Sequence, residues 1–546
     1  MKLCGTLCSP RVDTPVGSLA KKKRSNGQED VNDLQAVRVS VALPSGKLLL
    51  RDWHWPLSDT LASLRRAAHS SSGKAIGTIL SPHGQCLDNS TTAASSGLKS
   101  GDIVTAVVVN VAEGTYALVE GSKRLATLRM DGSVTCHDEL SMDSFAEVRD
   151  DLAESVVQSI HVNCHQFAAL TLHGSVVTWG AWTDGGKWKG MMKPDVRDQL
   201  RGGAKSVIAS RDCFAVLKDN GAVVTWTSAQ WGTDDFVREV QNKSEQLANG
   251  VKLVKALESA FVALKDDGSV ITWGQLAQPG YGNEMPTDRL ALGVESITAG
   301  KHAVAALLSD GSAAVWGSRS YGGDLYQGYG DNLTRGVEVP DKEKQLASGV
   351  QEIVAGGSGF AALKTDGSVV TWNNEGGHAV SAQLSSDVLK VLASNMGGFA
   401  ALKKHGQVVL WGKRSYGGGV LESALEAKLS LGVKEIIAFD TGFVALWEDG
   451  SAASWGRGGE RYPHDLLSKD VVSVTTASRA MAAVKIDGSV VTWGDATTGG
   501  DCSTVAEQLV GCVRVVSNSG TGFIAYNSSG AVLARWPSAE DMIKAS

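Results

Sequence analysis

One short pattern recurs along most of this chain, and it constrains the fold more than any other feature. The pattern is Phe-Ala-Ala-Leu-Lys-x-Asp-Gly-Ser-Val-Val-Thr-Trp-Gly, and it repeats with variations through residues 111–546. Self-similarity at intervals of about 40 residues is typical of propellers, solenoids and other repeat arrays. The turn glycine of the pattern occurs ten times, at Gly132, Gly174, Gly221, Gly268, Gly311, Gly367, Gly406, Gly450, Gly488 and Gly530.

The centre of each repeat predicts a β-hairpin. Most copies place Asp or Asn directly before the glycine, as in Asn220-Gly221 and Asp487-Gly488. Such pairs suit a type I′ turn, in which both central residues take positive φ, and the flanking residues are β-branched or aromatic. A further β-rich run lies upstream, for example at 294–300, so each repeat carries at least three strands, and a fourth could lie in the variable segment. Four strands in about 44 residues match a propeller blade.

A tryptophan follows the turn glycine by five residues in most repeats. A single hairpin is only marginally stable in water, so each repeat must bury its faces against its neighbours. A large aromatic residue at one fixed position is most simply a packing element between blades. We favour this interpretation over a set of ligand-stacking residues, because binding sites rarely need so many equivalents. The residues are Trp179, Trp226, Trp273, Trp316, Trp372, Trp411, Trp455 and Trp493.

These repeats resemble those of the regulator of chromosome condensation family. One copy carries the matching elements Ile297-Thr298-Ala299-Gly300, His302, Ala306-Leu307, Asp310-Gly311 and Trp316-Gly317. The resemblance implies a mainly β, propeller-like array of about ten repeats over 111–546. The chain departs from the family in two ways. The family histidine, nine residues before the turn glycine, is present only as His165 and His302, and ten repeats exceed the family's usual number of blades.

Residues 36–110 form a different kind of sequence. They predict a strand, a turn, a returning strand from Leu48, a helix from about Leu61, and two further strands near 79–80 and 103–109. This order resembles a small α+β ubiquitin-like (β-grasp) domain, with matching motifs at 43–47, 56–60 and 97–102. The chain continues past Val109 without a terminal Gly-Gly, which argues against a conjugated modifier. Two interpretations stay open: a module that docks a partner, and a small domain that only caps the array.

Charge and cysteine usage restrict the class of protein. The net charge of −6 lacks the basic footprint that is usual in nucleic-acid binders. The eight cysteines are scattered without a CxxC pair, which indicates reduced thiols in an intracellular protein, cytoplasmic or nuclear. No apolar run reaches about 18 residues, so we expect no membrane span. We expect residues 1–35 to be a disordered tail, in which the basic run Lys21–Arg24 is either a nuclear-import signal or, as we favour, a solvated charge run.

We find no catalytic, cofactor or metal site in the sequence. The motifs HExxH, GxxxxGK[ST] and GxSxG are absent, which leaves zinc-peptidase, P-loop and hydrolase chemistry without support. His161, Cys164 and His165 have the residue types of metal ligands, but zinc needs about four converging ligands. His165 is also the repeat histidine, so we interpret the three residues as structural. The prediction is a protein that is not an enzyme and needs no cofactor.

The variable segments between repeats are the expected binding surface, since loops on a rigid scaffold commonly carry function. Trp182 and Trp188 lie in a Gly- and Lys-rich segment, and Tyr321, Tyr326 and Tyr329 lie in the longest interval between turn glycines. Aromatic residues in such loops are candidate partner-binding anchors. An equally weighted alternative is that they fold back over the edges of the blades.

The sequence therefore predicts a non-catalytic protein-interaction scaffold. The ubiquitin-like region favours an adaptor in a ubiquitin-linked pathway. The family resemblance implies two alternatives, guanine-nucleotide exchange on a small GTPase and association with chromatin. No exchange residues can be matched, and the acidic balance argues against direct nucleic-acid contact. The expected partners are proteins, from the ubiquitin pathway or a small GTPase, and not membranes.

Overall fold

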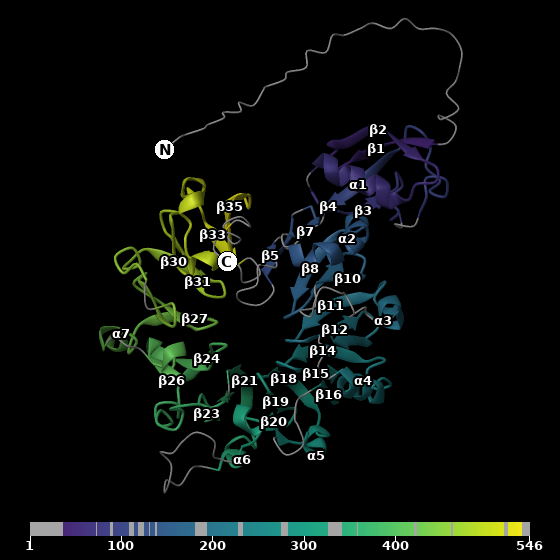
Figure 1. Cartoon of the computed structure of the whole chain (residues 1–546). Coiled ribbons are helices and arrows are strands. Elements are labelled where there is room, and N and C mark those ends of the chain that lie inside the picture. The colour runs from purple at the N-terminus through teal and green to yellow at the C-terminus, as the bar shows by residue number, and fades with distance from the viewer. Residues whose placement is uncertain are drawn as a thin grey trace, which may run out of the picture.

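The computed structural model describes most of the chain and shows a mainly β protein. A mixed four-stranded sheet comes first, and ten further sheets follow one another along the sequence. The ten sheets curve round in an arc, and the first sheet lies beyond the start of that arc (Figure 1). No helix within the described residues is long and apolar enough to cross a membrane. The described residues are 36–72, 74–87, 91–108, 114–117, 125–129, 131–136, 139–180, 194–227, 233–274, 282–325, 341–357, 359–419, 423–459, 462–517 and 522–537.

The N-terminal unit contains the five elements expected from the sequence. They are β1 (Ala36–Ala42), β2 (Leu48–Pro56), α1 (Leu61–Ser72), β3 (Ile76–Leu80) and β4 (Ile103–Val108). The strand order is β2-β1-β4-β3, with the central pair β1 and β4 parallel and both outer pairs antiparallel. Apolar residues of α1 pack on one face of this sheet, where Leu64 meets Val39 and Val104 in a single core.

Each of the ten remaining sheets, here called blades 1 to 10, is built from consecutive antiparallel strands. The strands are β5 (Gly114–Ala117), β6 (Leu125–Leu128) and β7 (Val134–Cys136); β8 (Val157–Val162), β9 (Phe167–Thr171) and β10 (Val176–Trp179); β11 (Ala204–Ala209), β12 (Cys213–Lys218) and β13 (Val223–Thr227); β14 (Val251–Ala256), β15 (Ala260–Lys265) and β16 (Val270–Gly274); β18 (Val294–Ala299), β19 (Ala303–Leu308) and β20 (Ala313–Ser318); β21 (Val350–Gly356), β22 (Gly359–Lys364) and β23 (Val369–Trp372); β24 (Val388–Ala393), β25 (Gly398–Lys403) and β26 (Val408–Gly412); β27 (Val433–Phe439), β28 (Gly442–Trp447) and β29 (Ala452–Gly456); β30 (Val471–Thr476), β31 (Ala480–Lys485) and β32 (Val490–Gly494); and β33 (Arg514–Ser517), β34 (Phe523–Tyr526) and β35 (Val532–Trp536).

The variable segments differ from the four-stranded blade considered above. Among the described residues a fourth strand occurs only in blade 5, where β17 (Gly282–Asn283) pairs with β20. Elsewhere the described parts of these segments are helices or turns, because they carry few buried apolar residues among polar ones and lack a β-branched run. The helices are α2 (Glu139–Glu154), α3 (Pro194–Gln199), α4 (Thr233–Asn242), α5 (Thr287–Leu290), α6 (Lys342–Gln345) and α7 (Ser423–Lys428), with 3-10 turns η2 (Arg319–Tyr321), η3 (Lys404–Gly406), η4 (Arg414–Tyr416), η5 (Ala496–Thr498) and η6 (Ser503–Leu509).

The hairpin turns correct the prediction of type I′ geometry. In blade 4 only Gly268 takes positive φ, and its N–H donates to the Lys265 carbonyl at 3.1 Å. This is a type I turn followed by a bulge at the glycine. The Asp267 carboxylate accepts the N–H and the hydroxyl of Ser269, and these hydrogen bonds also lower the pKa of Asp267. The serine that follows the glycine therefore favours this turn, whereas at His405-Gly406 both residues take positive φ.

The repeat tryptophans are packing elements between blades, as predicted. In blade 4 the rings of Phe261 and Trp273, which face each other across two strands, stack with centroids 5.3 Å apart. Both are buried in an apolar cluster with residues of blade 3, such as Leu217. The alternate residue Val262 points to the other face and joins the cluster shared with blade 5. Blade 4 therefore presents aromatic residues to the blade before it and aliphatic residues to the blade after it.

The turn glycines connect neighbouring blades as well as forming hairpins. The Gly221 carbonyl of blade 3 accepts the N–H of Val251, the first residue of blade 4, at 3.0 Å. A Cβ added to Gly221 would lie 2.8 Å from the backbone nitrogen of Gly250. Gly530 in blade 10 has a similar φ but open space around it. In the internal blades a glycine is favoured at this turn for two reasons. Its φ is positive, and the next blade approaches too closely to leave room for a Cβ.

We predict that Gly221→Ala destabilises the protein more than Gly530→Ala. Both substitutions place a Cβ at positive φ, which costs about 1 kcal/mol. Only Gly221→Ala also forces blades 3 and 4 apart, which adds about 2 kcal/mol. Urea denaturation of the two variants checks this, and equal losses of stability would contradict the packing described for blade 3.

Candidate interaction site on the loops between first and second strands

Four loops that join the first and second strands of blades 2 to 5 are connected in series. We call residues 163–166, 210–213, 257–260 and 300–303 the loop ladder. The Cys164 N–H donates to the Arg211 carbonyl at 3.0 Å, the Arg211 N–H to the Glu258 carbonyl at 2.9 Å, and the Glu258 N–H to the Lys301 carbonyl at 2.9 Å. Because the bonded residues are equivalent positions in successive repeats, their side chains are placed in a row.

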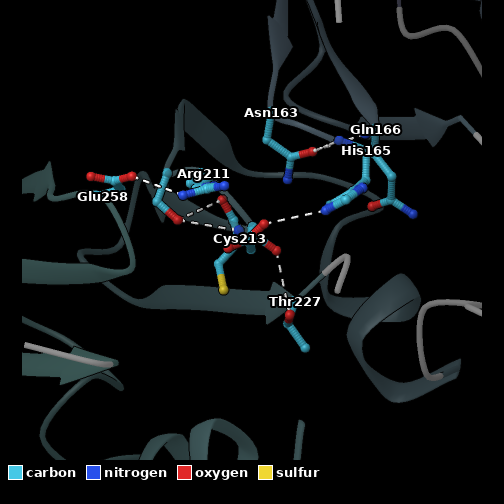
Figure 2. Close-up of polar contacts among 9 residues, drawn as sticks. Asn163, His165, Gln166, Arg211, Cys213, Thr227 and Glu258 are labelled. Atoms are coloured by element: carbon cyan, nitrogen blue, oxygen red, sulfur yellow. Dashed lines mark hydrogen bonds and ion pairs between the residues drawn. The ribbon is translucent and has the colours of Figure 1, made fainter. Parts of the chain in front are cut away.

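Short polar contacts fix each loop of the ladder on its own blade. The Asn163 side chain accepts the N–H groups of His165 and Gln166, at 2.9 and 2.8 Å (Figure 2). In the next loop the Cys213 N–H donates to the Ser210 hydroxyl at 3.2 Å. Such local bonds hold the backbone open as a turn rather than a continued strand.

Glu258 is the electrostatic centre of the ladder. Its Oε1 accepts from Arg211 Nη1 at 3.0 Å, which joins blade 3 to blade 4 (Figure 2). Its Oε2 lies 2.9 Å from Lys301 Nζ and 3.1 Å from His302 Nε2, both in blade 5. One carboxylate therefore spans three blades. At the other end of the ladder His165 Nε2 lies 3.2 Å from Asp212 Oδ1, which joins blade 2 to blade 3.

The acid and the bases of this cluster differ in their exposure. Partial burial of Glu258 would raise the pKa of its carboxyl group. The hydrogen bond and the charge of Lys301, together with His302 and Arg211, outweigh this effect, so that the pKa of Glu258 is lowered. For His302, burial outweighs the attraction of Glu258 and lowers the pKa. The Glu258 side chain is 18% exposed, whereas Arg211 and Lys301 are 58% and 52% exposed. The surface therefore presents cationic hydrogen-bond donors, with the carboxylate set behind them.

A second series of loops, in blades 7 to 9, also meets at a central carboxylate, but neutral side chains stand where the loop ladder has Arg211 and Lys301. The Asn395 side chain donates to Asp440 Oδ1 at 2.7 Å, and the Ser478 hydroxyl donates to Asp440 Oδ2. Here too a central carboxylate joins three blades, but both of its partners are neutral. The loop ladder is therefore distinguished by its charge and not by its backbone.

Cysteine chemistry does not explain the ladder. Burial, followed by the charge of Asp212, raises the pKa of the Cys164 thiol, and burial raises the pKa of Cys213 to about 11. Both thiols are thus protonated at neutral pH, which is unfavourable for a nucleophile. Within the described residues no group of three or more His, Cys, Asp or Glu side chains could hold a metal ion. What the ladder offers chemically is charge-assisted hydrogen bonding.

Only one of the aromatic residues predicted as partner anchors lies within the described part of the chain. Tyr321, in η2, is half-buried on the core shared by blades 5 and 6, and its ring meets His302 edge-on with centroids 4.3 Å apart. It thus lies against the end of the loop ladder. Trp182, Trp188, Tyr326 and Tyr329 fall outside the described residues, so their predicted role stays a prediction.

The charged residues of the ladder were missed by motif reasoning. They occupy the position ten residues before the turn glycine, where Arg211, Glu258 and Lys301 alternate in sign from blade to blade. The residues weighed from the sequence were Cys164 at this position and His165 and His302 at the next, but none of the three charged residues. The available signal was the alternation of charge at one repeat register, which brings opposite charges together when successive repeats stack.

Comparison with known proteins gives similarity to solved structures only. No family model and no curated protein matches the chain. One similar structure is the CRINKLY WD40 ectodomain of the Arabidopsis thaliana receptor kinase ACR4, at 15% identity over 55% of this chain and 96% of that one, with a TM-score of 0.26. Prp20p from Saccharomyces cerevisiae is 15% identical over 52% and 80%, with a TM-score of 0.27. Human WBSCR16 is 16% identical over 59% and 83%, with a TM-score of 0.24. Similarities of this degree identify neither a partner nor an activity.

We predict that Cys213 in the native protein is alkylated at pH 8 at least a hundredfold more slowly than in the unfolded chain. A pKa of about 11 instead of 9.0 lowers the thiolate fraction about a hundredfold, and burial restricts access further. Pulsed iodoacetamide labelling with mass spectrometry, in buffer and in guanidinium chloride, measures both rates. The exposed Cys86 serves as the control. Similar protection of Cys86 and Cys213 would contradict the structure of this loop.

Proposed function

We propose that this protein is a protein-interaction scaffold whose loop ladder binds acidic segments of partner proteins. The observation that carries the proposal is the arrangement around Glu258 of blade 4, whose largely buried carboxylate is flanked by an exposed arginine on blade 3 and an exposed lysine on blade 5. Arg211 and Lys301 keep donor groups directed to solvent after pairing with Glu258, because guanidinium and ammonium groups have several donors. A partner carboxylate can therefore be accepted without breaking the network.

The form of the ladder supports a macromolecular partner. Its residues come from four consecutive blades and are held at a fixed spacing by the backbone bonds between loops. An extended row of donors on a rigid β scaffold suits a peptide segment or a protein surface. Because the loops are already bonded to one another, binding would cost little ordering of the site, which favours affinity.

We also propose that the N-terminal unit is a ubiquitin-like module that docks a partner of its own. Its strand order, with a parallel central pair and one helix packed on a single face, supports the ubiquitin-like assignment. On the opposite face of the sheet Ile103 is 53% exposed, although its neighbour Ser40 is buried. This unit and the ladder together would make an intracellular adaptor with two binding surfaces.

The N-terminal unit has a specific contact with the array. Arg65 of α1 is buried, and its Nη1 lies 2.5 Å from Nε2 of His173, in the hairpin turn of blade 2. Burial, followed by the charge of Arg66, lowers the pKa of Arg65. A buried arginine in contact with the array supports a fixed position for this unit, in which the helix faces blade 2 and Ile103 stays exposed.

Charge reversal on the ladder tests the main proposal. The double variant Arg211→Glu/Lys301→Glu is compared with Lys205→Glu/Lys252→Glu, which makes the same change of charge at exposed first-strand positions of blades 3 and 4. In quantitative affinity capture from lysate, we expect the ladder variant to lose acidic partners at least tenfold and the control variant to keep them. Equal recovery by both variants, with unchanged melting temperatures, would refute the proposal.

A second capture experiment tests the N-terminal module. We expect Ile103→Asp to lose ubiquitin-pathway proteins selectively, because a charge on this sheet face opposes apolar docking. Ile486→Asp is the matched control, since Ile486 is an exposed isoleucine in the hairpin turn of blade 9. Unchanged recovery of those proteins by Ile103→Asp would contradict partner docking at this face and would favour a unit that only caps the array.

A further inference from the structure

The outer edges of blades 4 and 5 are covered in two different ways. In blade 5 the strand β17 covers the edge of β20, where Asn283 pairs with Gly317. In blade 4 the outer strand is β16, and no fourth strand among the described residues pairs with it. Its residue Gly274 is the repeat equivalent of Gly317, since each follows the repeat tryptophan. A bare edge presents N–H and C=O groups that can pair with other strands, so proteins usually cover it.

Two side chains from the segment before blade 4 cover this edge. Glu239 lies in α4, which runs beside β16 on the outer side of the arc (Figure 1), and Lys243 follows the end of α4. Glu239 Oε2 accepts the Gly274 N–H at 2.8 Å, while Lys243 Nζ donates to the Thr272 carbonyl oxygen. Lys243 Nζ also donates to Glu239 Oε1 at 2.9 Å, so the two contacts are tied together. We call Glu239 and Lys243 the edge clamp.

The edge clamp reproduces the hydrogen bonds of one strand residue. In a parallel pair of strands, a residue opposite position i donates its N–H to the carbonyl of residue i−1 and accepts the N–H of residue i+1. With Trp273 as position i, Lys243 supplies the donor that Thr272 accepts. Glu239 supplies the oxygen that accepts from Gly274. Both edge groups are therefore bonded without a fourth strand, through charged side chains instead of backbone.

The same edge N–H has a neutral acceptor in two other blades. In blade 2 the Gly180 N–H donates to the Ser144 hydroxyl at 3.1 Å. In blade 7 the Gly412 N–H donates to the backbone carbonyl of Glu375 at 2.6 Å. In blade 4 this bond depends on an ion pair whose lysine and glutamate side chains are 27% and 35% exposed. Water can compete for a pair with this exposure, which makes the cover of blade 4 the more easily broken one.

The edge clamp is separate from the apolar contacts of α4. Phe236 is buried in the cluster shared by blades 3 and 4, and Val240 packs against the same cluster. A helix of ten residues is marginal in water by itself, so α4 depends on its contacts with the blades. Loss of the clamp removes the bonds between the end of α4 and β16. It leaves the pairing of β14, β15 and β16 within blade 4 untouched.

We propose that α4 is a latch on blade 4, which opens locally when the edge clamp breaks and uncovers the outer edge of β16 while the three strands stay paired. Local opening costs much less free energy than global unfolding where few buried contacts are broken. Because Glu239 holds both the Gly274 N–H and the ammonium group of Lys243, the two edge bonds break together. The uncovered groups are of the kind that β17 pairs with in blade 5. The latch therefore switches blade 4 between a covered edge and a strand-accepting edge.

Native-state hydrogen exchange of the full chain tests the latch, followed by residue-resolved mass spectrometry in urea below the unfolding transition. Local opening exposes little surface, so exchange at Gly274 and at the Lys243 amide should change less than about twofold per molar urea. Exchange at Ala263, in the central strand β15, should rise more than about tenfold per molar urea, because it requires unfolding of the blade. Equal urea dependence at the three amides would overturn the proposal, since the edge would then open only with the whole blade.

A clamp variant and a matched control separate the latch from a general loss of stability. In Glu239→Ala we expect exchange at Gly274 and Lys243 to rise at least tenfold, with exchange at Ala263 unchanged. Glu245→Ala removes the same charge from an exposed side chain of the same segment and should leave all three amides as in the wild type. Faster exchange at Gly274 alone would overturn the latch, because α4 would then be held by its apolar contacts. Equal acceleration at Ala263 would overturn it too, because the clamp would then support the whole blade.

Discussion

The array depends on the packing between blades, which in seven of the ten blades includes a phenylalanine ring beside a tryptophan ring across two strands of one sheet. In blade 4 this pair, Phe261 and Trp273, is fully buried against blade 3. A hairpin of two such strands is only marginally stable by itself, and both apolar faces of blade 4 are buried against its neighbours. The large rings on one face and small aliphatic residues on the other make each blade complementary to its neighbours. Folding of one repeat is thereby coupled to the next, and the loops at the blade ends are held in a constant register.

That register explains how a charged site can be built without any contiguous motif. Arg211, Glu258 and Lys301 are far apart in sequence, but each stands at the same place in its own repeat. Backbone bonds between the loops bring the three side chains into one network. The Glu258 carboxylate is mostly buried, whereas Arg211 and Lys301 are exposed. The surface therefore offers mainly hydrogen-bond donors. The same backbone with Asn395, Asp440 and Ser478 has no such excess of charge.

The repeats and their hairpins could be predicted from the sequence, because the turn residues and the tryptophan recur within one short pattern. Sequence reasoning failed where a side chain acts through a hydrogen bond to another residue. The serine after Gly268 favours a type I turn by donating to Asp267, which the dipeptide Asp-Gly alone does not show. The repeat lysine gave no signal either, although Lys265 Nζ donates to the Gln246 carbonyl at 3.1 Å, near the end of the segment that precedes blade 4. The ladder was missed because its residue types change from repeat to repeat, and only their stacking makes them a site.

The central claim is that partners bind at the loop ladder through its cations. Zero-length carbodiimide cross-linking of the native chain in lysate, with mass spectrometry of the linked peptides, tests it most directly, because this reagent joins a lysine only to a carboxylate in contact with it. The account predicts that links from Lys301 to partner carboxylates exceed those from Lys205 and Lys252 on the first strands. Intermolecular links spread equally over the three lysines, or absent from Lys301, would contradict it.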